Sequence, residues 1–494
     1  MKRSSKEKLQ IIQRLIEGEL MKSHIPPKKC STHPIIRPKK CSKPCFFVRK
    51  NVSLQQIFVR KIVIMKRKAY QVLLKWKDSP NRKPLILCGA RQVGKTWLMK
   101  EFCKLEYKKV VYVNFDHDER LRGLFDQDYD IERILFALQV ATGVIPTPED
   151  TLIILDEIQE VKRGLGVLKY FYEDAPDFHV IVAGSLLGIA LHPGTSFPVG
   201  KVNMINIHPL DFEEFLWATG NNELGILLEK QDWKLISAFK PKFVEMLRRY
   251  YFVGGMPEVV SNFIDHNDIA EVRLLQNNIL TAYRNDISKH APSAVVQRIL
   301  MVLNSLPSQL SKENKKFIYG AVKKGSRAND FELAIQWLID CGIVTKVPRI
   351  KKAAIPLKIY EDLSAFKLFF LDLGLLAALC EAPADMMLIK DNIFEEFKGM
   401  FTEQYVLQQL VARGDVNTYY WSSERNDAEI DFVIQKGGII IPIEVKAEEN
   451  VKAKSLSSFV SSNPELHGIR LSMSDFREQD WMTNIPLFCV IHSV

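Results

Sequence analysis

KPLILCGARQVGKTWLMKEF, residues 83–102, is the stretch that decides the fold. Four apolar residues lead into Gly-Ala-Arg-Gln-Val-Gly-Lys-Thr, and an amphipathic segment follows at once. The order strand, glycine loop, helix, with the spacing G-x-x-x-x-G-K-[ST], is that of a phosphate-binding loop. At ordinary composition this pattern would arise by chance in roughly 1–2% of chains of this length, and the flanking segments make chance a weaker explanation still.

The residue types of this loop each have a chemical reason. Gly89 and Gly94 allow the backbone angles that turn successive N–H groups toward a phosphate. The positive end of the following helix points at the same anion. Lys95 would reach the β- and γ-phosphates, and the Thr96 hydroxyl would bind Mg²⁺. The predicted nucleotide-binding residues are Gly89, Ala90, Arg91, Gln92, Val93, Gly94, Lys95 and Thr96.

Two adjacent carboxylates follow a later apolar strand. Residues 151–155 deliver Asp156 and Glu157 at the strand's end. Asp156 fits the acid that completes the Mg²⁺ site with Thr96, and Glu157 fits the general base that polarises the attacking water. An acidic helix cap would explain either residue alone. It is the weaker explanation here, because the pair follows a phosphate-binding loop with one further strand, 110–115, in between.

Two more strands extend the predicted parallel sheet, at residues 179–183 and 202–207. Ser185 follows the first of them, so it would lie at the carboxyl edge, where ligands bind in such sheets. Ser185 is therefore a candidate γ-phosphate sensor, although an ordinary turn serine explains it nearly as well.

Length and charge limit the classes of protein to consider. A chain of 494 residues should form two to four domains. The net charge of +10 is concentrated in residues 1–64, which hold 16 of the 68 Lys and Arg and only 3 of the 58 Asp and Glu. The remaining chain carries 52 basic and 55 acidic groups. Its overall charge therefore gives no argument for nucleic-acid binding by the folded part.

The first 64 residues differ from the rest in composition. Lys and Pro dominate residues 26–50, which predicts a basic, disordered extension. A second interpretation is that Met65 is the true start. Four potential zinc ligands occur here at irregular spacings that disfavour a metal site: Cys30, His33, Cys41 and Cys45.

The other cysteines stand singly in apolar surroundings, as reduced buried thiols do. A charged start without an apolar core excludes a secretory signal. No apolar run reaches the ~18 residues that a membrane helix needs. We therefore expect a cytoplasmic protein with no membrane partner.

Six motifs in order carry a resemblance: GARQVGKTWL, YVNFD, LIILDEIQ, VIVAGS, HPLDFEEFL and YFVGGMPEVV. From about residue 65 to the end, the chain resembles the AAA-type ATPases of bacteria and archaea in which the ATPase is fused to a carboxy-terminal domain of uncharacterised function. The resemblance implies ATP and Mg²⁺ as ligands and a helical lid over residues 216–290, with Gly-Gly-Met-Pro near the nucleotide. The family's catalytic glutamate directly follows the Mg²⁺ aspartate, as Glu157 follows Asp156. The chain contains no N-K-x-D motif, which favours ATP over GTP.

Residues 291–365 suggest a winged helix. Helices are predicted over 295–303 and 312–319, and a third helix ends at Cys341-Gly342 before a strand at 343–347. The region is locally basic through Lys312, Lys315, Lys316, Lys323, Lys324, Arg327, Arg349, Lys351 and Lys352. A DNA-binding face and a solvated surface on a module that relays nucleotide state explain this cluster about equally well.

A second group of charged residues lies near the carboxyl end. Residues 428–434 and 439–446 predict two strands joined by a Lys-Gly-Gly turn. Period-two alternation places Glu444 and Lys446 on one face, with Asp431 on the neighbouring strand within reach. We expect Glu444 and Lys446 to be rigid without being buried.

This hairpin resembles the PD-(D/E)XK nuclease core. The resemblance implies that Asp431 and Glu444 hold Mg²⁺ and that Lys446 orients or deprotonates a water for attack on a phosphodiester. Glu403, from a helix predicted over 401–411, would add a carboxylate. Ile430 stands where the family has proline, which is not a ligand. A hairpin with one polar face is the competing explanation.

The predicted fold class is α/β: a P-loop NTPase parallel sheet (65–215), a helical lid (216–290), a winged helix (291–365) and a restriction-endonuclease-like domain (366–494). The expected function is ATP hydrolysis that controls a nuclease-like, DNA-contacting domain. The alternative is a regulatory ATPase whose nuclease-like fold is inactive and binds DNA or protein. A homo-oligomer and a protein partner both remain open.

Overall fold

The computed structural model describes residues 65–161, 163–184, 197–312, 315–388, 398–424, 428–447 and 453–494. The chain divides into two units, 1–57 and 58–494, and every described residue belongs to the second. The predictions for the basic extension, its cysteine cluster and Ser185 lie outside the described residues. Within the described ranges, no helix has the length and apolarity that crossing a bilayer requires.

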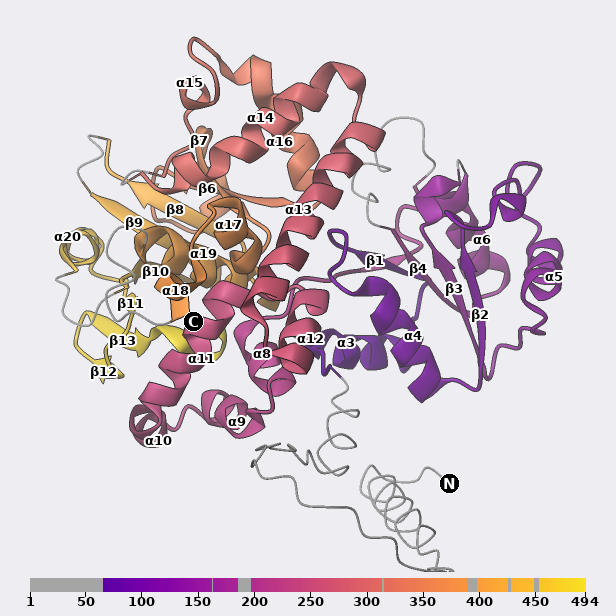
Figure 1. Cartoon of the computed structure of the whole chain (residues 1–494), viewed down its shortest axis with the longest axis horizontal. Helices are drawn as coiled ribbons and strands as arrows, with labels where there is room; N and C mark the ends of the chain where they lie inside the picture. The colour runs from indigo at the N-terminus through magenta and orange to yellow at the C-terminus, as the bar shows by residue number, and fades with distance from the viewer. Residues whose placement is uncertain are drawn as a thin grey trace, which may run out of the picture. The chain divides into compact units, whose positions relative to one another are not determined.

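The first sheet is parallel throughout, as the sequence predicts (Figure 1). Its strand order is β2-β3-β4-β1-β5. The strands are β1 (Leu85–Cys88), β2 (Lys109–Asn114), β3 (Thr151–Asp156), β4 (His179–Ala183) and β5 (Asn203–Asn206). Strand β4 lies between β1 and β3, so the phosphate-binding loop and Asp156 leave the same sheet edge one strand apart.

Continuous apolar runs form the three central strands, β1, β3 and β4, because both faces of the sheet are covered there. Leu85 and Leu87 pack in one core, and Ile86 packs in the other. Strand β3 alternates in the same way and is buried along its whole length. The helices of this part are α3 (Lys68–Lys77), α4 (Lys95–Glu106), α5 (Ile131–Thr142) and α6 (Val167–Asp174).

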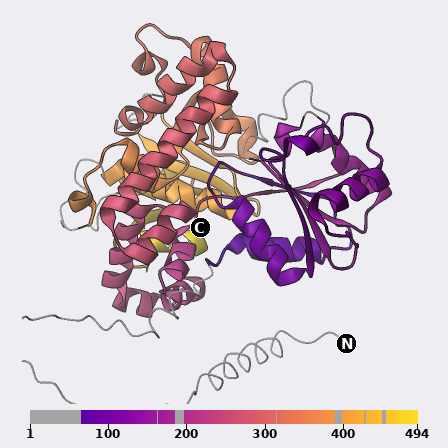
Figure 2. The same cartoon turned by 45° about the vertical axis from the view of Figure 1, so that its right-hand side comes forward.

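Six helices follow the sheet: α8 (Phe212–Ala218), α9 (Asn222–Lys230), α10 (Trp233–Ala238), α11 (Lys240–Val253), α12 (Pro257–His266) and α13 (Ile269–His290). The Gly-Gly-Met-Pro turn ends α11 and begins α12. A Cβ atom on Gly255 would lie 2.1 Å from the Leu210 carbonyl oxygen, so only glycine allows this close approach. Figure 2 shows the length of α13 from a second angle.

The predicted winged-helix region contains α14 (Ser293–Leu310), α15 (Tyr319–Val322), α16 (Ala328–Asp340), β6 (Val344–Ile350) and β7 (Glu361–Phe370). The prediction of a helix over 312–319 is wrong. Residues 315–318 are not helical, and the Phe317 N–H donates to the carbonyl of Phe366 in β7. Backbone pairing with this strand takes precedence over local helix propensity.

Eight strands form the second sheet, in the order β12-β13-β11-β10-β9-β8-β6-β7. The strands after β7 are β8 (Thr418–Ser422), β9 (Glu429–Lys436), β10 (Ile439–Val445), β11 (Gly468–Ser472), β12 (Arg477–Glu478) and β13 (Met482–Pro486). Strands β9 and β10 form the predicted antiparallel hairpin. Because β6 pairs with β8, the hairpin β6–β7 belongs to this sheet, and the expected boundary at 365/366 falls inside β7.

Five helices accompany the second sheet: α17 (Leu373–Leu379), α18 (Ala384–Leu388), α19 (Lys398–Arg413), α20 (Lys454–Ser462) and α21 (Val490–Ser493). Residues 401–410 of α19 are all buried, including three glutamines. The Gln409 side-chain oxygen accepts from the Phe212 N–H of α8, and Gln404 bonds both backbone groups of Phe370 in β7. Helix α19 thereby connects the helices after the first sheet to the second sheet.

Candidate functional sites

The phosphate-binding loop runs between β1 and α4, where the sequence places it. Gly89 and Gly94 have φ angles of 135° and 92°, which few other residues adopt. A Cβ atom on Gly89 would lie 2.3 Å from the Ile207 carbonyl oxygen. Both glycines are therefore required by the backbone path and not only by a ligand.

Lys95 lies beneath this loop and is 7% exposed. Its Nζ atom donates to the carbonyl oxygens of Gly89 and Ala90, each at 2.8 Å. Burial lowers the pKa of Lys95 to about 8, although the charges of Glu157 and Asp156 oppose the shift. The ammonium is thus held beneath the loop by two carbonyl oxygens, in surroundings that make it easier to deprotonate than an exposed lysine.

Asp156 is the hydrogen-bonding centre of the neighbouring group. Its Oδ2 atom accepts from the hydroxyls of Thr96 at 2.9 Å and Tyr112 at 3.0 Å. Burial raises the pKa of Asp156, against the effect of these two bonds. Glu157 follows with φ of 53° and accepts from Gln159 Nε2 at 2.5 Å. The structure brings Lys95, Thr96, Asp156 and Glu157 to one edge of the sheet.

A cavity of about 720 Å³ opens beside this group. Lys95, Thr96 and Glu157 line one side, and residues of α12 and α13, including Pro257 and Asp286, line another. A volume of this size is within the range of small-molecule sites. The carboxyl edge of the sheet and the helices that follow it therefore share one pocket.

Elements far along the chain contact the loop directly. The Tyr283 hydroxyl of α13 donates to the Arg91 carbonyl at 2.9 Å, and Arg91 Nε lies 2.7 Å from Asp286 Oδ2. Gly342, after α16, lies beside the loop, and a Cβ there would be in ordinary contact with the Ala90 nitrogen at 3.4 Å. The loop is therefore in contact with α13 and with the end of α16.

Sequence reasoning missed several residues of this site. Arg67, 5% exposed, donates to the carbonyls of Val93 at 3.1 Å and His208 at 2.6 Å. Tyr112, Tyr283 and Asp286 were also not anticipated. Tyr112 had a usable signal, because alternation in β2 places it on the same face of the sheet as Asp156 of the neighbouring strand. Arg67 precedes α3, and Tyr283 and Asp286 lie on α13, far along the chain, so their positions in the sequence gave no such signal.

The second constellation lies on β9 and β10. Asp431 Oδ2 accepts from the Val445 N–H at 2.7 Å, and Lys446 Nζ lies 2.6 Å from Glu444 Oε1. Glu444 is 3% exposed, so the expectation that it would not be buried is wrong. Its second oxygen, Oε2, is buried and has no hydrogen-bond partner among the described residues. Two helices, α19 and α20, lie against β10 and cover it.

Glu403 belongs to the same charged neighbourhood but faces two lysines. Lys315 Nζ lies 2.6 Å from Glu403 Oε1, and Lys367 Nζ lies 3.5 Å from Oε2. Lys367, in β7, is fully buried and also lies 2.5 Å from Glu429 Oε1. Lys367 is the one charged residue in the apolar run 365–371, so the sequence does contain a signal for this buried site.

The pKa shifts of these groups follow burial and the neighbouring charges. Burial and then the charges of Glu403 and Glu444 raise the pKa of Asp431 well above its usual value. Burial also raises the pKa of Glu444, while Lys446 opposes the shift. For Glu403 burial acts in the same direction, but Lys315 and Lys367 outweigh it and the pKa falls. The described residues contain no group of three or more side chains arranged to hold a metal ion.

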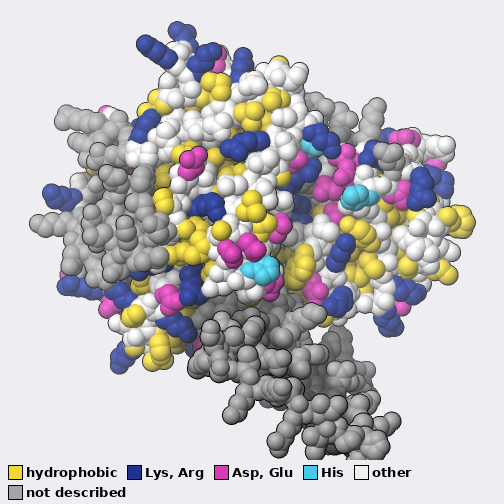
Figure 3. Space-filling view, in the orientation of Figure 1, with side chains coloured by type: hydrophobic (Ala, Val, Ile, Leu, Met, Phe, Trp, Pro, Cys, Tyr) yellow, Lys and Arg dark blue, Asp and Glu magenta, His cyan; other side chains and the backbone are white. Residues whose placement is uncertain are grey.

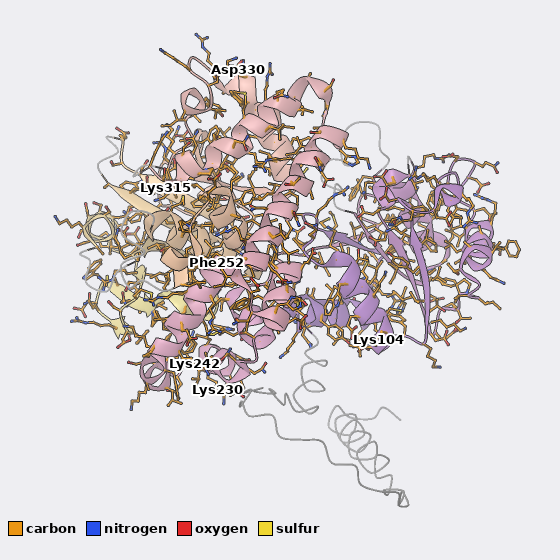
Figure 4. The ribbon with its side chains drawn as sticks, viewed as in Figure 1. Lys104, Lys230, Lys242, Phe252, Lys315 and Asp330 are labelled. Carbon is orange, nitrogen blue, oxygen red and sulfur yellow. The ribbon has the colours of Figure 1, made fainter. Side chains whose placement is uncertain are left out.

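The basic cluster of the predicted winged-helix region is only partly on the surface. Lys315 and Arg349 form internal ion pairs, with Glu403 and Asp362 respectively. Lys323, Lys324 and Arg327 are exposed near the start of α16, which Asp330 marks in Figure 4. Figure 3 shows Lys and Arg side chains gathered at the corresponding edge of the molecule.

Comparisons with known proteins support the first site. A family model described as "AAA domain" matches residues 81–216. Two models described as domains of unknown function match residues 244–386 (DUF8612) and 398–490 (DUF4143). Curated proteins give no significant match.

Solved structures with significant matches include DNA-bound ORC1 of Aeropyrum pernix, at 14% identity and a TM-score of 0.25, covering 65% of this chain and 93% of that chain. AMPPCP-bound DnaA of Aquifex aeolicus matches at 13% identity and a TM-score of 0.25, covering 56% and 88%. TM-scores of this size carry no argument about function. The family match and the loop geometry together support an AAA-type P-loop ATPase domain over residues 81–216.

Proposed function

We propose that this protein binds and hydrolyses ATP and that its nucleotide state acts on the carboxy-terminal half of the chain. One observation supports this most directly: Lys95, Thr96, Asp156 and Glu157 line a single sheet edge whose loop α13 contacts. The match to an AAA domain supports the same chemistry.

The residues fit the roles that ATP hydrolysis requires. Lys95 would exchange its two carbonyl partners for phosphate oxygens, which gives the phosphate a charge-assisted bond. Thr96 and Asp156 supply the oxygen ligands that Mg²⁺ prefers, and Mg²⁺ when bound would neutralise phosphate charge. Glu157 would orient and polarise the attacking water.

The route to the carboxy-terminal half begins at Arg91. Its carbonyl and its side chain are both bound by α13, through Tyr283 and Asp286. A phosphate in the loop would compete with Asp286 for the Arg91 guanidinium, because both are anions. Helix α13 packs on α14 and α17, so a shift of α13 reaches the predicted winged-helix region and the second sheet.

ATP turnover should separate binding from chemistry at this site. Lys95→Ala should abolish nucleotide binding, because the loop loses the ammonium buried beneath it. Glu157→Gln should bind ATP but hydrolyse it ~10²–10⁴-fold more slowly, since the shape remains and the base is lost. Phosphate release and equilibrium binding of a fluorescent ATP analogue measure the two effects. Near-normal turnover by Glu157→Gln would show that another group is the base.

Nucleotide affinity should fall as pH rises through the pKa of Lys95, about 8. Only the protonated amine attracts phosphate, so ATP should bind about tenfold more weakly at pH 9 than at pH 7. Calorimetry at pH 8.5 in buffers of different ionisation enthalpy should detect uptake of about three quarters of a proton per ATP bound. Equal ATP affinity at pH 7 and pH 9 would contradict the lowered pKa of Lys95.

Hydrogen exchange should report the contact between loop and helix. In Glu157→Gln, ATP with Mg²⁺ should change the amide exchange of residues 269–290, and in Lys95→Ala it should not. Tyr283→Phe removes the hydroxyl bond to Arg91 with almost no change in volume, so it should reduce the effect. Helix α5, which packs in the opposite core, serves as the internal control. An unchanged α13 in ATP-bound Glu157→Gln would refute the relay.

A second candidate function is metal-dependent phosphodiester cleavage at Asp431, Glu444 and Lys446. The unpartnered, buried Oε2 of Glu444 favours it, because an oxygen left without a partner in a protein interior costs about 1–3 kcal/mol unless a ligand satisfies it. Asp431 and Glu444 offer oxygens suited to Mg²⁺ or Mn²⁺, which when bound would polarise a phosphodiester. Lys446 lies beside them and could orient water.

Plasmid nicking tests this second function. The unmodified protein with Mn²⁺, with and without ATP, should convert supercoiled DNA to the nicked form. Glu444→Ala should abolish nicking and leave ATP hydrolysis intact, whereas Glu478→Ala, at an exposed position of β12, should change neither. If the unmodified protein neither binds metal at this site nor cleaves DNA, a binding module for DNA or protein replaces the catalytic proposal.

A further inference from the structure

The neighbourhood of Glu403 has an unusual balance of charge. Four carboxylates gather there on α19, β9 and β10: Glu403, Glu429, Asp431 and Glu444. Three ammonium groups accompany them, from Lys315, Lys367 and Lys446. Counted as fully ionised, the group has one negative charge in excess. Buried charges of one sign are stable only when opposite charges offset them, so each lysine is needed.

Lys315, unlike the other two lysines, does not extend from a strand of the second sheet. Lys367 and Lys446 extend from β7 and from the end of β10, within the second sheet. Lys315, which is labelled in Figure 4, reaches Glu403 from the non-helical link formed by residues 315–318 before α15. The backbone N–H of Phe317 fastens this link to β7. The Lys315 side chain is 9% exposed, and the Glu403 side chain is 6% exposed.

The Lys315 ammonium occupies the oxygen that Glu403 would offer to a metal ion. Glu403 Oε1 is bound at 2.6 Å and Oε2 faces Lys367 at 3.5 Å. Among the described residues, Glu403 Oε2 and Glu444 Oε2 are both buried without a hydrogen-bond partner. As they lie, the carboxylates of the described residues form no metal-binding group, although their charges perturb one another.

We propose that Lys315 is an internal cation that blocks this site and that its withdrawal allows Glu403 to join Asp431 and Glu444 around a divalent ion. Removal of the Lys315 charge leaves two negative charges in excess, which is the charge of one Mg²⁺ or Mn²⁺. The proposal rests on the second candidate function and adds its regulation. Because α14 packs on α13, the link that carries Lys315 is also joined to the helix that contacts the phosphate-binding loop.

Mn²⁺ binding to the full chain, without nucleotide, tests the proposal. Lys315→Met should bind one Mn²⁺ at this site at least tenfold more tightly than the unmodified protein does. Electron paramagnetic resonance of free Mn²⁺ measures the affinity. Lys315→Arg keeps the charge and Lys324→Met removes an exposed lysine of the same region, so both should behave as the unmodified protein. Adding Glu403→Gln to Lys315→Met should remove the gained site.

Thermal unfolding covers the case in which Lys315→Met is unstable, because it leaves Glu403 with only its more distant lysine. Mn²⁺ should then raise the melting temperature of Lys315→Met by several degrees more than that of the unmodified protein, since a ligand stabilises a state in proportion to how tightly it binds that state. Lys315→Met with Glu403→Leu, which removes both charges, should fold and show no response to Mn²⁺.

The outcomes distinguish two claims: that Asp431 and Glu444 belong to a metal site, and that Lys315 blocks it. Equal and tight Mn²⁺ binding by the unmodified protein and Lys315→Met would overturn the block and leave the metal site standing. No Mn²⁺ binding by either protein would overturn the metal site and the block with it. A gain in Lys315→Met that survives Glu403→Gln would overturn the role of Glu403.

Discussion

The described part of the molecule depends on one constraint: polar groups buried between its first and second halves must find partners. Asp372, which is fully buried, is the centre of that arrangement. Its carboxylate accepts from the backbone N–H groups of Gly255 at 2.7 Å and Leu375 at 3.0 Å, and from Gln408 Nε2 at 3.0 Å. One side chain therefore holds the Gly-Gly-Met-Pro turn, α17 and α19 together. Each such bond left unmade would cost about 1–3 kcal/mol.

This arrangement makes the helices after the first sheet inseparable from the second sheet. Gln408 also bonds the Tyr250 hydroxyl, which in turn donates to the Leu210 carbonyl next to α8. The glycines of the turn fit here because side chains would collide with Leu210 and Asp372. Pro257, directly after the turn, lines the same pocket as Lys95. In the proposed relay, these hydrogen bonds would offer a route from the nucleotide pocket to the second sheet.

The charged group around Glu403 obeys the same constraint with ions instead of amides. A buried ion pair is weak evidence of stability, because desolvation offsets much of the attraction. Such a group is instead sensitive to the loss of any one member, which leaves the others uncompensated. The proposed withdrawal of Lys315 would use this sensitivity, because it would leave Glu403 without its nearest cation.

The phosphate-binding loop, the strands before and after it, and the hairpin that carries Asp431 and Glu444 could be predicted from the sequence. Their signals are local: a fixed spacing of glycines and Lys95, and an alternation over a few residues. The sequence also determined that Asp156 and Glu157 would meet the loop, since carboxyl ends of parallel strands share one edge. Only the tertiary structure decided that Asp286 pairs with Arg91 and that Lys315 pairs with Glu403, 88 residues away. Which two residues form an ion pair depends on how separate helices and strands pack together. Periodicity within one helix or strand does not predict that packing.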